Sequence, residues 1–208
     1  MSVIITLLAI ICAYILGKRS RLYRTNAGER KVAELIQAQL DPQKEILLNN
    51  ITLPCNDGST TQIDHLLISQ YGIYVIETKD YSGWIFGDPL SARWTQVLYR
   101  RKTRFQNPIR QNYAHIKAIS ALFDFLPAQD IHSLVVFSGD AKFKTPMPAG
   151  VIYADEISKY LSSRQEMTIS LNRVQFCLGR LSFYRMPPNE ATDKLHIQNL
   201  RKKHNRLA

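Results

Sequence analysis

The chain has 208 residues, enough for one domain of ordinary size with extensions. With 45% hydrophobic and 21% charged residues it has the composition of a folded protein, so disorder is not its default state. Its net charge of +10 favours polyanionic partners such as nucleic acid or anionic lipid, although the same charge also serves solubility. Its three Cys residues are far apart and form no CxxC pair, which argues against a zinc module and a disulfide framework.

The first segment is predicted to be a membrane anchor. Residues 2–17 carry no charge, and the run is slightly shorter than the ~20 residues of a typical spanning helix. The basic residues follow the apolar run, which is the reverse of a cleaved signal peptide. They are Lys18, Arg19, Arg21 and Arg24. By the positive-inside rule we expect a single-pass protein of the inner (cytoplasmic) membrane whose soluble domain faces the cytoplasm. A buried core helix is the alternative.

The remaining elements alternate between the two periods of secondary structure. In chain order we predict a helix at 25–40, strands at 45–53, 61–69, 72–79, 84–86 and 93–99, a helix at 109–126, strands at 133–137 and 151–153, helices at 155–161 and 171–184, and a possible helix from residue 190. Asn26 and Glu29 form a capping box at the start of the first helix. The pattern predicts an α/β fold with helices flanking a central sheet.

The most informative stretch is the predicted hairpin of strands 61–69 and 72–79. If the strands pair symmetrically about the two-residue turn between them, Asp64 lies opposite Glu77. Opposed residues have Cβ atoms roughly 4.5–5.5 Å apart. Lys79 lies two residues beyond Glu77 and therefore on the same face. The sequence thus predicts two carboxylates and an amine at one end of an otherwise apolar sheet face.

Such an arrangement is costly unless it has a function. Two adjacent carboxylates repel each other, so one takes up a proton or a cation lies between them. Carboxylate oxygens suit Mg²⁺ or Mn²⁺, and such an ion activates water and stabilises charge on a phosphate. Lys79 can orient the water or neutralise the developing charge. A structural cluster of Lys79 with the two carboxylates is the alternative, and the pairing geometry alone does not decide between them.

Several short motifs together carry a family resemblance. They are Gly28-Glu29, Gln62-Ile63-Asp64-His65, Gly72 to Lys79 followed by Gly83, then Trp94, Asn107-Pro108 and Gln111-Asn112. In type, order and spacing these motifs resemble the nuclease-related domain (NERD) family, which is similar to the PD-(D/E)xK nucleases. The resemblance covers roughly residues 26–123. It implies a restriction-endonuclease-like fold, with a central mixed sheet flanked by helices, and metal-dependent phosphodiester hydrolysis.

The resemblance also implies roles for individual residues. Asp64 and Glu77 would hold the Mg²⁺ (or Mn²⁺), with Glu29 of the first helix assisting. Lys79 would support the nucleophile or the transition state, and Gln111 would help to position them. From the residues alone, Glu29 is equally well explained as the acid of the capping box, and Gln111 as a solvated helix start.

Two histidines near these residues are given no role in the predicted metal site. In the family pattern a tyrosine follows the glutamine by four residues, and here that position is His115, whose role the departure leaves open. The more common outcome for such a histidine is exposure to solvent. His65 alternates to the face opposite Asp64, so we expect it in packing or on the surface rather than at a metal.

A basic cluster precedes the second long helix. Its members are Arg100, Arg101, Lys102, Arg104 and Arg110, and no acid lies among them. We predict a loop that contacts nucleic-acid phosphates in a salt-sensitive manner without reading sequence. A charged, solvated loop is the alternative.

The sequence therefore predicts five consecutive regions. They are an anchor at 1–17, a basic juxtamembrane segment at 18–24, a NERD-like core at 25–126, an α/β extension of the same domain at 127–185 and a basic tail at 186–208. The predicted function is that of a membrane-tethered, metal-dependent nuclease that hydrolyses phosphodiester bonds in DNA. The alternative is a non-catalytic nucleic-acid-binding module or scaffold held at the membrane.

Overall fold

The computed structural model describes residues 27–55 and 57–205. The first half contains α2 (Ala27–Gln37), β1 (Glu45–Pro54), β2 (Thr60–Ser69), β3 (Gly72–Lys79), β4 (Gly83–Phe86), β5 (Arg93–Leu98) and β6 (Arg101–Gln106). The second half contains α3 (Pro108–Leu122), β7 (Ile131–Phe137), β8 (Ala141–Phe143), β9 (Val151–Tyr153), α4 (Ile157–Ser162), α5 (Leu171–Tyr184) and α6 (Glu190–Asn205).

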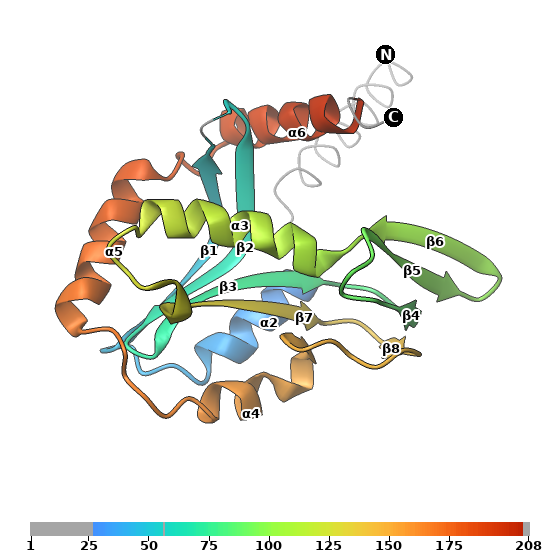
Figure 1. Ribbon diagram of the computed structural model, residues 1–208, viewed down its shortest axis with the longest axis horizontal. Helices are drawn as coiled ribbons and strands as arrows, with labels where there is room; N and C mark the ends of the chain where they lie inside the picture. The colour runs from blue at the N-terminus through green and yellow to red at the C-terminus, as the bar shows by residue number, and fades with distance from the viewer. Residues whose placement is uncertain (1–26, 56, 206–208) are drawn as a thin grey trace, which may run out of the picture.

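The centre of the fold is a five-stranded mixed sheet in the order β1-β2-β3-β7-β9. The neighbours β1–β2 and β2–β3 are antiparallel, whereas β3–β7 and β7–β9 are parallel. Helices α3 and α5 cover one face of the sheet, and α2 and α4 cover the other (Figure 1). The predicted α/β architecture, a central mixed sheet flanked by helices, is confirmed.

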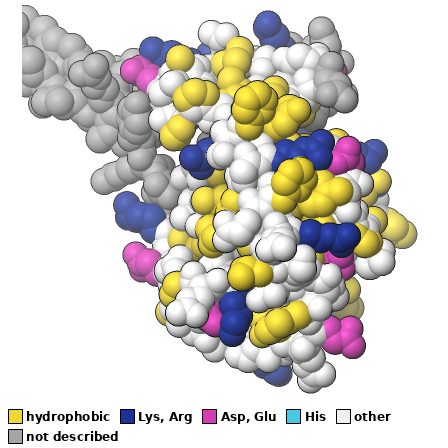
Figure 2. All heavy atoms as spheres, turned by 90° about the vertical axis from the view of Figure 1, so that its left-hand side faces the viewer, with side chains coloured by type: hydrophobic (Ala, Val, Ile, Leu, Met, Phe, Trp, Pro, Cys, Tyr) yellow, Lys and Arg dark blue, Asp and Glu magenta, His cyan; other side chains and the backbone are white. Residues whose placement is uncertain are grey.

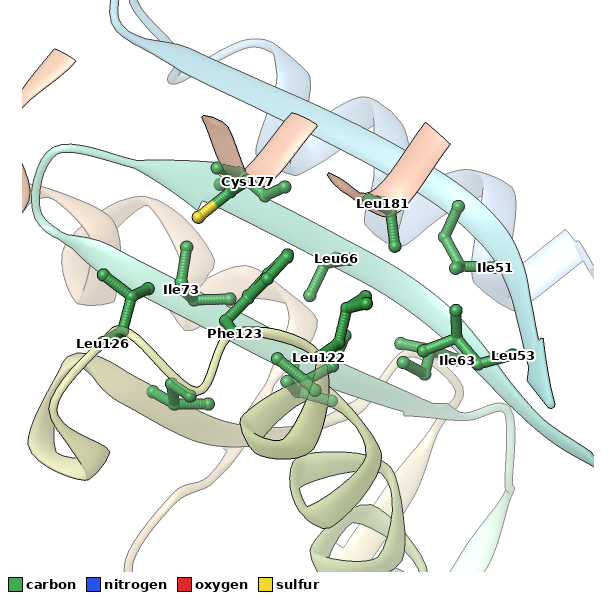
Figure 3. Close-up of a cluster of buried hydrophobic side chains, with 14 of the residues drawn as sticks. Ile51, Leu53, Ile63, Leu66, Ile73, Leu122, Phe123, Leu126, Cys177 and Leu181 are labelled. Atoms are coloured by element: carbon green, nitrogen blue, oxygen red, sulfur yellow. The ribbon is translucent and has the colours of Figure 1, made fainter. Parts of the chain in front are cut away.

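The hydrophobic pattern of β2 and β3 explains this layering. Leu66 and Val75 point toward α3 and α5, whereas Leu67 and Ile76 point toward α2 and α4. Strands that are covered on both faces are expected to be nearly continuous apolar runs, as these are. Figure 3 shows the core on the α3 and α5 side, which includes Ile51, Leu53, Ile63, Leu66, Ile73, Leu122, Phe123, Leu126, Cys177 and Leu181.

A second sheet lies beyond the carboxyl end of β3, at the right of Figure 1, in the order β6-β5-β4-β8. Residues 101–106, predicted as part of a loop, instead form β6 and pair with β5 along its whole length. The many charges in this segment lower its intrinsic strand preference. The pairing of Phe105 with the buried Trp94 supplies the cross-strand contact that compensates. The three-residue strand β8 was also not predicted.

Helix boundaries differ modestly from the prediction. Helix α3 begins at Pro108, where the Asn107 side chain accepts a hydrogen bond from the Ile109 amide at 2.9 Å. It ends at Leu122 rather than at residue 126, because Phe123 leaves helical geometry and is fully buried in the core.

The anchor predicted at 2–17, the basic segment at 18–24 and the cap Asn26 lie outside the described residues. Within the described ranges, no helix has the length and apolar character needed to span a membrane. Figure 2 views the molecule from the α5 side, where hydrophobic side chains lie among Lys and Arg side chains. The most exposed aromatic residue of α5 is Phe183, which retains 83% of its accessible surface.

The close approach of α2 to the ends of β3 and β7 depends on Gly28. A Cβ atom built at this position would lie 2.4 Å from Ser138 Oγ and 2.6 Å from Asp80 Cβ. Gly28→Ala should therefore lower the free energy of unfolding by about 1–3 kcal/mol, as overpacking typically does. Urea denaturation followed by circular dichroism would measure the change.

The matched control is Gly179→Ala in the exposed part of α5, where no atom lies within 4 Å of the added Cβ. Alanine is preferred over glycine in a helix, so this variant should gain about 0.5–1 kcal/mol. A Gly28→Ala protein as stable as Gly179→Ala would contradict the packing described for α2.

Candidate active site

The predicted hairpin register is confirmed from Ser69 and Gly72 as far as His65 and Ile76, where the ladder ends before the predicted pair of Asp64 and Glu77. Asp64 lies one residue beyond this point and is positioned beside the end of β3. Its Oδ2 atom accepts a hydrogen bond from the Thr78 backbone amide at 2.8 Å. The backbone of β3 thus holds the Asp64 carboxylate next to Glu77.

Glu77 is the most enclosed charged group of this cluster, with 2% of its side chain exposed. Its Oε1 accepts hydrogen bonds from Lys79 Nζ at 2.6 Å and from Gln111 Nε2 at 2.7 Å. Its Oε2 lies 3.2 Å from His115 Nε2. Lys79 Nζ also donates to Gln111 Oε1 at 3.0 Å. Strand β3 and helix α3 therefore meet in one continuous polar network.

The two carboxylates have opposite electrostatic environments. Burial would raise the pKa of Glu77, but the hydrogen bond from His115 and the charge of Lys79 outweigh it and lower that pKa. Burial and the negative charge of Glu77 raise the pKa of Asp64 to about 8, against the opposing Thr78 amide. Glu29 adds to this increase, which brings a third carboxylate of the site into electrostatic contact with Asp64.

These residues fit a divalent cation that binds oxygen. Among the residues that the structure describes, no three His, Cys, Asp or Glu side chains form a ready cage for an ion. Mg²⁺ rarely needs one, because it is usually bound by one or two carboxylates together with water and substrate phosphate. Asp64 and Glu77 could serve as these carboxylates, and a cation would oppose the negative charge of Glu77, which together with burial raises the pKa of Asp64.

His115 belongs to this cluster, and the expectation that it is solvated is wrong. It is 6% exposed and lies between Glu77 and Thr61, whose Oγ1 is 2.6 Å from His115 Nδ1. Its position one helical turn after Gln111 was the available signal. That spacing could not reveal Thr61, which reaches the ring from β2.

The C-terminal helix α6 contacts the same strand at the neighbouring residue. His196 Nδ1 lies 2.9 Å from Thr60 Oγ1, and Asn199 Nδ2 donates to the same oxygen at 3.3 Å. Helix α6 therefore packs next to the point at which β2 contacts His115. No pattern in the sequence predicts this arrangement.

A second network lies behind the site, on the α2 face of the sheet. His65 is buried, and burial lowers its pKa to about 4, so the ring is neutral near pH 7. Its Nδ1 donates to Asn49 Oδ1 at 2.7 Å, which leaves Nε2 to accept from the Thr78 hydroxyl at 3.1 Å. His65 thus fixes Thr78, the residue whose amide holds Asp64.

The predicted basic residues do not form one loop. Arg100 lies in the turn of the β5–β6 hairpin, and Arg101, Lys102 and Arg104 lie on β6. Arg110 lies in the first turn of α3, where its guanidinium donates to the Leu90 carbonyl at 2.7 Å. The structure thus brings Asp64, Glu77, Lys79 and Gln111 together and places the basic residues on adjoining elements.

Comparison with known proteins gives two matches. The sequence matches the family model of the nuclease-related domain (NERD) over residues 24–138. It is also 37% identical over 158 residues to an uncharacterized protein of Bacillus anthracis, covering 74% of this chain and 73% of that protein. No solved structure matches. The family model spans the residues of the polar cluster and ends just after β7, so α6 lies beyond it.

The raised pKa of Asp64 predicts a pH-dependent cost in stability. In metal-free buffer the folded protein keeps this proton up to about pH 8, whereas the unfolded chain releases it near the ordinary value of 3.8. The free energy of unfolding therefore falls as the pH rises from 3.8 to about 8. Asp64→Asn cannot ionise and still accepts the Thr78 hydrogen bond.

At pH 8 in EDTA, Asp64→Asn should raise the melting temperature by at least ~2 °C, the shift given by about 1 kcal/mol in a domain of this size. The gain should shrink at pH 5. Asp140→Asn, at an exposed carboxylate, serves as the control. A lower melting temperature for Asp64→Asn at pH 8 would contradict the electrostatic description.

Proposed function

The chain belongs to the nuclease-related domain (NERD) family, and from this premise we propose that it hydrolyses phosphodiester bonds in DNA with a bound Mg²⁺ or Mn²⁺. The observation that carries the proposal is the buried Glu77 carboxylate with Lys79 and Gln111 on it and Asp64 beside it. The proposal includes a restriction-endonuclease-like arrangement of the sheet. It also includes a membrane tether formed by residues 2–17.

Within this proposal Asp64 and Glu77 hold the ion, and Glu29 adds negative charge beside them. A bound divalent ion lowers the pKa of its water and neutralises charge on the phosphate. His115 and Gln111 fix the Glu77 carboxylate from α3, so that its oxygens keep one orientation. Groups held in place before the reaction need no reorganisation during it.

Lys79 supplies the positive charge of the site. Its side chain is 16% exposed, against 2% for Glu77, so Lys79 is the more accessible of the two residues. A substrate phosphate that approaches from solvent can therefore reach Lys79 more readily than Glu77. Lys79 is therefore placed to stabilise the charge that develops on the phosphate in the transition state.

A second function, nucleic-acid binding without turnover, is favoured by a different observation. Strand β6 carries Arg101, Lys102 and Arg104 and no acid, and all three side chains are exposed. Binding through these groups is sensitive to salt and does not require a divalent ion. The two functions therefore differ in their dependence on metal.

The catalytic proposal predicts that Glu77→Gln and Lys79→Ala each lower the cleavage rate by at least about a hundredfold, as loss of an electrostatic contact in an active site does. The measurement is cleavage of labelled DNA by the full-length chain in detergent, with Mg²⁺, with Mn²⁺ and with EDTA. Lys159→Ala, at an exposed lysine of α4, is the matched control and should retain full activity.

Calorimetric titration of Mn²⁺ into the same proteins tests the ion site independently. Binding should weaken in Asp64→Asn and Glu77→Gln and persist in Lys159→Ala. Full cleavage by both Glu77→Gln and Lys79→Ala would overturn the residue assignment. The second function would be favoured if the unaltered chain does not cleave DNA but binds it in a salt-sensitive manner that does not depend on the divalent ion.

A further inference from the structure

The β6-β5-β4-β8 sheet has two different faces. Side chains alternate along its strands, so those of Ile85, Trp94 and Phe105 share the inner face and pack against Phe137 of β7. The residues that alternate with these three along the strands have their side chains on the outer face, where they form cross-strand pairs. These pairs are Trp84 with Val97, Phe86 with Thr95, Val97 with Lys102, Thr95 with Arg104, and Trp84 with Lys142.

The outer face is strongly basic. Its cationic side chains are Arg93, Lys102, Arg104, Lys142 and, just after β8, Lys144. None of the four strands contains an acidic residue. In the part of the chain that the structure describes, none of the five cations forms a salt bridge. The face therefore attracts an anionic backbone that runs across it.

Two aromatic rings are exposed in the middle of these charges. Trp84 and Phe86 lie two residues apart on β4, a central strand of this sheet, and remain 50% and 40% exposed. The Lys144 ammonium lies 4.7 Å from the centre of the Trp84 ring. The inner-face Trp94, by contrast, is only 1% exposed. The sheet does not need the outer rings for its core, and together with the surrounding cations they form a candidate contact surface.

We propose that this outer face binds single-stranded nucleic acid, with unpaired bases stacked on Trp84 and Phe86 and phosphates held by the surrounding Lys and Arg. Aromatic rings on a basic sheet suit a single strand, because every unpaired base presents a flat face for stacking. The bases of a duplex are already stacked on one another and expose only their edges in the grooves.

The position of this face bears on the substrate of the proposed nuclease, an inference that rests on the proposed function. Strand β4 begins four residues after Lys79, and Phe137, which supports the inner face, pairs with Lys79 in the central sheet. The second sheet therefore adjoins the catalytic edge through its inner face, and the outer face is turned away from Phe137. The favoured substrate is then a nucleic acid that carries an unpaired segment in addition to the bond that is cleaved.

The test measures binding without cleavage, so that its outcome is independent of catalysis. Full-length chain in detergent is titrated in EDTA against three fluorescent probes by anisotropy. The probes are a 15-nucleotide oligothymidylate, an oligouridylate of equal length and a DNA duplex of equal length. The first two distinguish DNA from RNA, and the third tests the preference for unpaired bases.

Trp84→Ala and Phe86→Ala should each weaken binding of the single strands about tenfold, the effect expected for loss of one stacked base. Their effect on duplex binding should be less than twofold. Trp84→Phe should retain most of the affinity. Phe183→Ala, which removes an exposed aromatic ring of α5, is the matched control and should leave binding unchanged.

Tryptophan fluorescence gives a second measurement. The chain has two tryptophans and Trp94 is buried, so stacking should quench the emission of Trp84. Quenching should disappear in Trp84→Phe although that variant still binds. Single-strand affinity unchanged in both Trp84→Ala and Phe86→Ala, or an equal loss for the duplex, would overturn the proposal. If Glu77→Gln loses cleavage but still binds the single strands, the result supports the catalytic role of Glu77 and shows that binding is independent of it.

Discussion

The buried carboxylate of Glu77 imposes the constraint on which the rest of the site depends. A charge at the end of a central strand, sealed from water, is tolerated only when several donors surround it. Lys79 provides one donor from the same strand, while Gln111 and His115 provide two more from α3. The amino-terminal half of α3 must therefore lie over the end of β3, which fixes the helix and the sheet relative to each other.

This constraint extends further through shared partners. The ring of His115 is held between Glu77 and Thr61, so β2 is tied to α3 as well as to β3. On the opposite face, His65 holds Thr78, and the Thr78 amide holds Asp64. The same short stretch of β3 is thus braced from both faces of the sheet. Such bracing holds the Asp64 and Glu77 side chains in fixed positions relative to each other.

The sequence was sufficient for the part of the site that follows from local periodicity. Alternation along two strands and a two-residue turn determine the register as far as His65 and Ile76, and the Thr78 amide then holds Asp64 beside the end of β3. The environment of His115 was not predictable in this way, because its partners lie 54 and 38 residues away in the chain. Strand β6 was missed for a similar reason, since the pairing with β5 overrides its charged composition.

The two sheets differ in how many of their faces contribute to the hydrophobic core. In the central sheet both faces are buried, and its buried polar side chains, such as Glu45, Ser69 and Glu77, have hydrogen-bond partners. In the second sheet the inner face alone builds a core around Trp94 and Phe137. Its outer face is free of packing demands and can carry cations and exposed rings at little cost to stability. Folding does not require the outer face to be basic or aromatic, yet it is both. Ligand binding therefore explains its composition better than stability does.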